Sequence, residues 1–86
     1  MSYQPDELQE ILSIYKAETE EHLQSLNEGL LRLEKEPRRI ETLEEIFREA
    51  HSLKGAARMI GFEAVEKIAH ALEDLFSLAR KGELDF

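Results

Sequence analysis

The sequence predicts an all-α protein, a bundle of long amphipathic helices. Apolar residues recur at steps of three and four along three stretches, a spacing that places them on one face of a helix. Only two prolines and four glycines interrupt the 86 residues, and no stretch alternates as a strand would. The expected helices cover about residues 6–33, 41–60 and 62–81, and residues 1–86 are expected to form one domain.

The first helix is expected to begin at Asp6, because Asp6 and Gln9 have the spacing of a capping box. Its apolar stripe also contains Thr19 and His22, and we expect His22 to have a packed or capped structural role. Pro37 should end the helix and begin a connector, since proline cannot continue a helix. The apolar positions of this helix are Leu8, Ile11, Leu12, Tyr15, Leu23, Leu26, Leu30 and Leu33.

The second helix is expected to begin near residue 40 or 41, where Thr42 and Glu45 have the spacing of a cap. Gly61 suits the left-handed conformation that ends many helices, so the second and third helices should form an antiparallel hairpin. The third helix should end just before Gly82, because basic residues occupy its last turn. The two stripes are Leu43, Ile46, Phe47, Ala50, Leu53, Ala57 and Ile60, then Phe62, Val65, Ile68, Ala69, Leu72, Leu75, Phe76 and Ala79.

Three helices with wide apolar stripes leave part of a bundle open. A closed bundle usually needs a fourth helix to cover such stripes. We therefore expect the missing helix to come from a longer parent protein or from a second copy of this chain. The isolated chain is accordingly expected to be marginally stable, and dimeric or domain-swapped.

Composition excludes several classes of function. The absence of cysteine excludes disulfides, thiolate catalysis and cysteine-bound zinc. No apolar run approaches the roughly 20 residues of a transmembrane helix, and no signal peptide is evident, so a cytoplasmic protein is expected. A net charge of −8 argues against binding nucleic acid or anionic membranes and favours a protein partner. No glycine-rich phosphate loop is present, so no ATP site and no cofactor are expected.

The stretch around His51 is the strongest candidate for chemistry. His51 lies at the edge of the second apolar stripe and should be half exposed, with Lys54 and Gly55 on the same helical face. A glycine inside a helix costs about 0.5–1 kcal/mol relative to alanine, so Gly55 indicates that something large must reach the imidazole. Lys54, and Arg48 or Arg58, could pair with a bound anion.

The predicted hairpin brings a second group toward His51. His70 and Glu73 share one face of the third helix, and counting outward from Gly61 places His51 level with His70. A carboxylate that accepts the proton of one ring nitrogen would leave the other nitrogen as a nucleophile. This arrangement suits a histidine that accepts a phosphoryl group.

Three segments together resemble a known family. FREAHSLKGAA at 47–57, IGF at 60–62 and AHALEDL at 69–75 closely resemble the histidine phosphotransfer (Hpt) domain. The likeness is greatest to the N-terminal domain of CheA-type chemotaxis histidine kinases, and it covers nearly the whole chain. The resemblance implies an antiparallel up-and-down four-helix bundle of the Hpt type, of which three helices are present. It also implies that the chain is an N-terminal fragment of a larger signalling kinase.

The resemblance also implies residue roles. His51 matches the phosphorylated histidine, Lys54 the lysine that faces the phosphoryl group, and Gly55 the glycine that leaves room for a docking receiver domain. His70 and Glu73 match the pair that hydrogen-bonds with the imidazole and tunes it. The implied partners are a histidine kinase catalytic domain, which holds the ATP site, and response-regulator receiver domains.

Docking is expected on the face around His51, Ser52 and Gly55. Arg58 departs from the family pattern, because relatives often carry a small residue there. It adds a positive charge about two turns from His51 and is expected to affect phosphate affinity or the choice of partner.

Two other functions remain open on the sequence alone. His51, His70 and Glu73 could offer three metal ligands, although an adjacent Lys54 would repel a cation and the order reverses that of di-iron bundles. The other alternative is a helical docking or dimerisation module that is never phosphorylated. That alternative leaves Gly55 unexplained.

Overall fold

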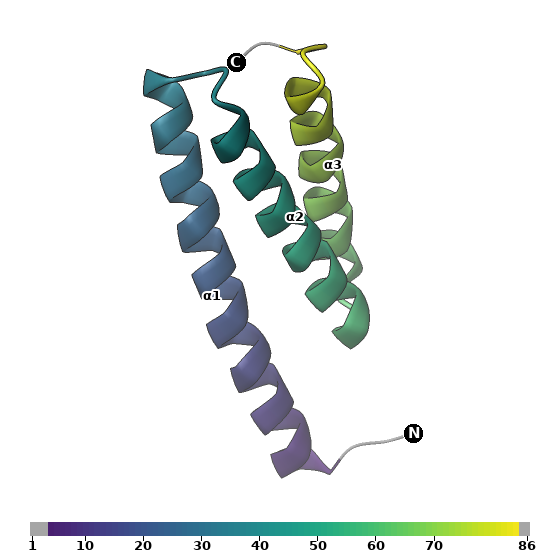
Figure 1. Cartoon of the computed structure of the whole chain (residues 1–86). Coiled ribbons are helices and arrows are strands. Elements are labelled where there is room, and N and C mark those ends of the chain that lie inside the picture. Colours follow the sequence, from purple (N-terminus) through teal and green to yellow (C-terminus); the bar gives the residue numbers. More distant parts are fainter. Residues whose placement is uncertain (1–3, 85–86) are drawn as a thin grey trace.

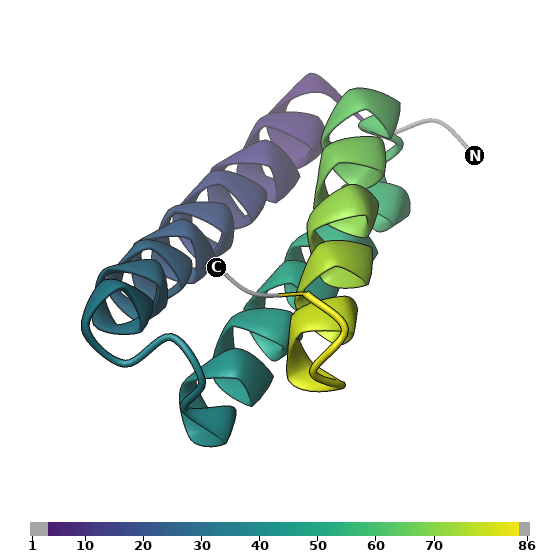
Figure 2. The same cartoon turned by 90° about the horizontal axis from the view of Figure 1, so that it is seen from above.

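Three helices make up the computed structural model, which describes residues 4–84. They are α1 (Pro5–Lys35), α2 (Ile40–Ile60) and α3 (Glu63–Arg80), and no strand occurs in that range. The bundle is antiparallel, with α2 packed against both α1 and α3 (Figure 1). Seen from above, α1 and α3 flank α2 on two sides (Figure 2). The predicted fold class and the number of helices are therefore confirmed. Within residues 4–84, no helix has the length and apolar character needed to cross a lipid bilayer.

The two predicted N-terminal caps are wrong. The N-cap of α1 is Gln4 and that of α2 is Arg39, and neither uses a side-chain hydrogen bond. In α1, Pro5 occupies the first turn, where its fixed φ and missing N–H suit a helix start, so Asp6 lies inside the helix. In α2, Thr42 lies inside the helix and is only 5% exposed, so it is packed within the bundle and does not cap the helix.

The predicted reversal between α2 and α3 is confirmed at Gly61. This residue has φ +80°, in the left-handed region that glycine adopts readily. The N–H of Phe62 donates to the carbonyl of Ala57 at 2.9 Å, and the N–H of Gly61 donates to that of Arg58. These bonds satisfy carbonyls at the end of α2. They hold α3 against α2 in a tight hairpin.

One continuous core joins the three helices. Phe76 and Ile46 are the largest side chains with almost no exposure. The other buried apolar residues are Leu26, Leu33, Leu43, Ala50, Leu53, Ala57, Ala69 and Ala79. These residues belong to the predicted stripes, so the helical periodicity identified the core face of each helix.

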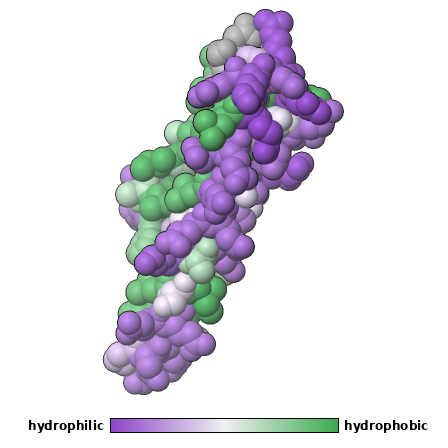
Figure 3. Space-filling model, turned by 90° about the vertical axis from the view of Figure 1, so that its left-hand side faces the viewer, coloured by the Kyte–Doolittle hydropathy of each residue, from purple (hydrophilic) through white to green (hydrophobic). Residues whose placement is uncertain are grey.

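Part of the predicted stripe of α1 remains exposed. The first turns of α1 extend past the α2–α3 reversal (Figure 1), and Leu8, Leu12 and Leu23 are 39–49% exposed. Figure 3 views the molecule from the side of α1 and shows hydrophobic surface between hydrophilic regions along its length. The expectation that a further helix or a second copy covers such surface stays a prediction.

Gly29→Ala is expected to destabilise the fold, whereas Gly55→Ala should stabilise it. A Cβ at Gly29 would clash with Cγ2 of Ile46, which is fully buried, whereas a Cβ at Gly55 meets nothing within 4 Å. The expected changes in the free energy of unfolding are a loss of about 1–3 kcal/mol at Gly29 and a gain of about 0.5–1 kcal/mol at Gly55. Urea unfolding of the two variants measures both values. Equal effects at the two positions would contradict the packing described here.

Candidate functional site

The imidazole of His51 stands on the outer face of α2 and contacts α3. Its side chain is 65% exposed, and its Nδ1 is hydrogen-bonded to Oε2 of Glu73. An ionised carboxylate has no proton to give, so Nδ1 is the donor in this bond. The neutral ring then carries its lone pair on Nε2. The contact thus fixes one tautomer and leaves Nε2 as the nucleophilic nitrogen.

The second oxygen of Glu73 is also occupied. Nζ of Lys54 donates to Oε1 at 2.7 Å, and both side chains are largely buried, with 15% and 11% exposed. Burial alone would raise the pKa of Glu73, but the hydrogen bonds from Lys54 and His51 outweigh it and hold the pKa below its usual value. Glu73 is therefore ionised at neutral pH and joins the imidazole to the ammonium.

Glu73→Gln should destabilise the protein at pH 7 and less so in acid. The folded protein holds the pKa of Glu73 below the value of 4.5 expected when it is unfolded. The ionised carboxylate therefore stabilises the fold above that pH, and this contribution is lost as the pH falls through the folded pKa. We expect a difference in unfolding free energy of roughly 1–3 kcal/mol at pH 7 that shrinks below pH 4.5.

Urea unfolding of the wild type and Glu73→Gln at several pH values measures this difference. Glu44→Gln serves as the control, because Glu44 is an exposed carboxylate on α2. A difference between wild type and Glu73→Gln that stays constant from pH 7 to pH 3 would contradict the role of the ionised form.

A hollow of about 380 Å³ surrounds the exposed edge of the imidazole. It is lined by Phe47, Arg48, His51, Ser52 and Glu73. The sequence predicts only a core position for Phe47. Its position one helical turn before His51 is the signal that could have predicted its place in the hollow. The hollow gives an incoming group access to the imidazole.

Gly55 and Ser52 are both exposed on α2. No atom lies within 4 Å of a Cβ built on Gly55, so its lack of a side chain serves no internal packing. Arg58 is also exposed, and its Nε donates to Oε2 of Glu66 at 2.7 Å. Arg58 does not line the hollow, and the docking roles predicted for these three residues stay predictions.

The predicted pairing of His51 with His70 is not found. His51 lies level with Glu73, and the pairs His51–Glu73 and Arg58–Glu66 are both centred on residue 62. The turn consists of Gly61 and Phe62, whereas the count from the sequence assumed a turn at Gly61 alone. The residue of α3 that lies opposite His51 is therefore further along the chain than His70.

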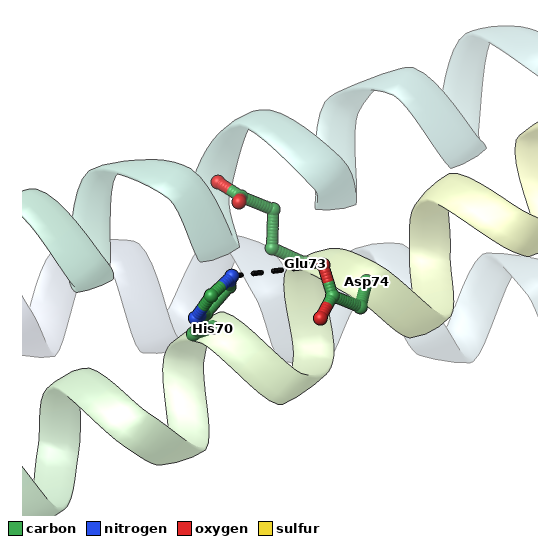
Figure 4. Close-up of side chains that lie close together, drawn as sticks. All are labelled: His70, Glu73 and Asp74. Carbon is green, nitrogen blue, oxygen red and sulfur yellow. Dashed lines mark ion pairs between the residues drawn. The ribbon is translucent and has the colours of Figure 1, made fainter.

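His70 instead lies on an exposed face of α3, with Nε2 3.7 Å from Oδ1 of Asp74. Figure 4 shows the carboxylate of Glu73 pointing toward α2, away from His70 and Asp74. The three residues have potential ligand atoms within 4.8 Å of one another. Metal binding there would compete with the two hydrogen bonds of Glu73, and the set of His51, His70 and Glu73 is not brought together.

A second histidine–glutamate pair connects α1 to α2. Nδ1 of His22 is 2.6 Å from Oε2 of Glu49, and both side chains are partly buried. This contact agrees with the structural role predicted for His22. Glu49 could not be predicted as the partner of His22 from the sequence, because the two residues belong to different helices.

Comparisons with known proteins agree with this geometry. The family model of the Hpt domain matches residues 10–86. The chemotaxis protein CheA of Halobacterium salinarum is 45% identical over 91% of this chain, and that of Bacillus subtilis is 35% identical over 92%. The chain spans 12% of the length of each of these relatives.

A solved structure extends the similarity to the fold. The CheA phosphotransferase domain from Thermotoga maritima superposes with a TM-score of 0.87 at 43% sequence identity. The match covers 90% of this chain and 73% of the other. The resemblance deduced from three short segments therefore holds over the helical fold as well. The chain belongs to the Hpt domain family and is homologous to the phosphotransfer domains of CheA proteins.

Proposed function

We propose that this chain is the histidine phosphotransfer module of a two-component phosphorelay. His51 accepts a phosphoryl group from the catalytic domain of a histidine kinase and passes it to the aspartate of a response-regulator receiver domain. The observation that carries the proposal is the hydrogen bond from Nδ1 of His51 to the ionised Glu73, which leaves the lone pair of the neutral ring on Nε2 of a side chain that is 65% exposed.

The first transfer uses the lone pair of Nε2. This nitrogen attacks the γ-phosphorus of ATP, an N–P bond forms, and the bond from that phosphorus to the bridging oxygen breaks as ADP leaves. The proton on Nδ1 stays in place, so the ring becomes positively charged. Glu73 lies against that proton and stabilises the charge that develops. ATP itself is held by the kinase domain.

The second transfer reverses the role of the histidine. A carboxylate oxygen of the receiver attacks the phosphorus, the N–P bond breaks, and the electron pair returns to Nε2. The exposure of His51 and the open space at Gly55 support the approach of a receiver domain. Lys54 positions Glu73 through its 2.7 Å hydrogen bond. The direct phosphoryl contact that the resemblance implies for Lys54 stays a prediction.

The proposal also concerns the protein from which the domain comes. The two relatives described above are named chemotaxis proteins, and this chain spans 12% of the length of each. We infer that residues 1–86 form one Hpt domain of a larger, cytoplasmic chemotaxis-type histidine kinase.

Phosphorylation of the intact chain tests the proposed function. The protein is incubated with a CheA-type kinase catalytic core and labelled ATP, and the label is located by mass spectrometry. We expect an acid-labile, base-stable label on His51. A folded chain that takes up no label from cores that phosphorylate another Hpt domain would favour a docking module without phosphotransfer.

A further inference from the structure

Arg48 is an exposed residue of α2, three positions before His51, and it lines the same hollow. Residues three positions apart on a helix are neighbours on its surface. The side chains of Arg48 and His51 therefore lie next to each other along α2, at the same hollow.

Arg48 differs from the other arginines in its lack of an internal partner. Within residues 4–84, its guanidinium makes no hydrogen bond, ion pair or ring contact. The other five arginines all interact inside the molecule. These contacts are Arg32 with Glu45, Arg39 with Glu36, Arg58 with Glu66, Arg80 over the ring of Phe47, and an interaction of Arg38.

The cation predicted to face the phosphoryl group is already engaged. Nζ of Lys54 donates to Glu73, and its side chain is only 15% exposed. Lys54 does not line the hollow, and moving its ammonium there would remove a hydrogen bond from a buried carboxylate. The cation that is free to meet an anion at the hollow is therefore Arg48.

We propose that Arg48 binds the phosphoryl group carried on Nε2 of His51, an inference that rests on the proposed function. A guanidinium matches the geometry of a phosphoryl group because two N–H groups can donate to two of its oxygens. The chain has a net charge of −8, so a dianionic group on its surface needs a local positive charge. Arg48 supplies that charge on the outer side, while Glu73 and Lys54 act on the inner side of the ring.

A small phosphodonor distinguishes phosphoryl binding by Arg48 from a role of Arg48 in docking a protein partner. Phosphoramidate transfers its phosphoryl group without a protein partner. Nε2 attacks the phosphorus, the N–P bond of the donor breaks, and the leaving nitrogen takes up protons to become ammonia. The rate of phosphohistidine formation is measured by ³¹P NMR for the wild type, Arg48→Ala and Arg48→Lys. Arg39→Ala is the control, because it removes the same charge at the connector between α1 and α2.

We expect Arg48→Ala to slow phosphorylation by about five- to tenfold, while Arg39→Ala matches the wild type. The pH at which the attached phosphoryl group loses its last proton should rise in Arg48→Ala and be partly restored in Arg48→Lys. A change in the titration of the phosphoryl group would not be expected if Arg48 only stabilised the fold.

Two results would overturn the inference. One is an equal rate and an equal phosphoryl titration in Arg48→Ala and Arg39→Ala. The other is a defect of Arg48→Ala that appears only with a protein donor or receiver, because that would assign Arg48 to docking. A wild type that forms no phosphohistidine on His51 would instead overturn the proposed function itself.

Discussion

His51→Gln is expected to abolish phosphorylation while preserving the fold. The amide of glutamine has no lone pair of comparable nucleophilicity, so no N–P bond can form at this position. The side chain of His51 is 65% exposed, and a glutamine amide can still donate to Glu73. The change in unfolding free energy should therefore stay at about 1 kcal/mol or less.

Label uptake from a kinase core measures this effect. His22→Gln is the matched control, because His22 also contacts a glutamate through Nδ1 and lies outside the hollow. We expect full labelling of the control and none of His51→Gln. A label that persists in a folded His51→Gln variant would move the phosphoacceptor to another residue and refute its assignment.

Gly55→Gln should block transfer to a receiver domain. A Cβ at this position meets no atom of the protein within 4 Å, so the added side chain projects into the space that a partner would occupy. A steric clash of about 1–3 kcal/mol at an interface corresponds to a transfer rate lower by roughly 5- to 150-fold. The fold should be retained, because alanine at the same site is expected to stabilise it.

The measurement compares two transfers in the same variant. Phosphorylation of His51 by phosphoramidate should be unchanged, whereas loss of the phosphoryl group to a receiver should be slow. Ala17→Gln provides the control, since Ala17 is an exposed residue on α1. Transfer at the wild-type rate would show that Gly55 does not serve access.

The sequence alone determined the secondary structure and the core face of each helix. Hydrophobic periodicity depends only on the rotation of successive residues about one helix, so it located the three helices and their core faces. Gly61 marked the reversal, because its conformational freedom is a property of the residue itself. The position of His51 at the edge of a stripe likewise indicated an exposed imidazole.

The tertiary structure decided which side chains meet. Periodicity gives neither the axial register of one helix on another nor the rotation that packing selects, so the sequence placed His70 level with His51. Packing of α3 on α2 instead buries Glu73 between His51 and Lys54 and leaves His70 exposed. The capping prediction at Thr42 failed for a similar reason, since Thr42 is drawn into the core of the bundle. Contacts between helices depend on how their surfaces fit, and no local pattern in one helix contains that information.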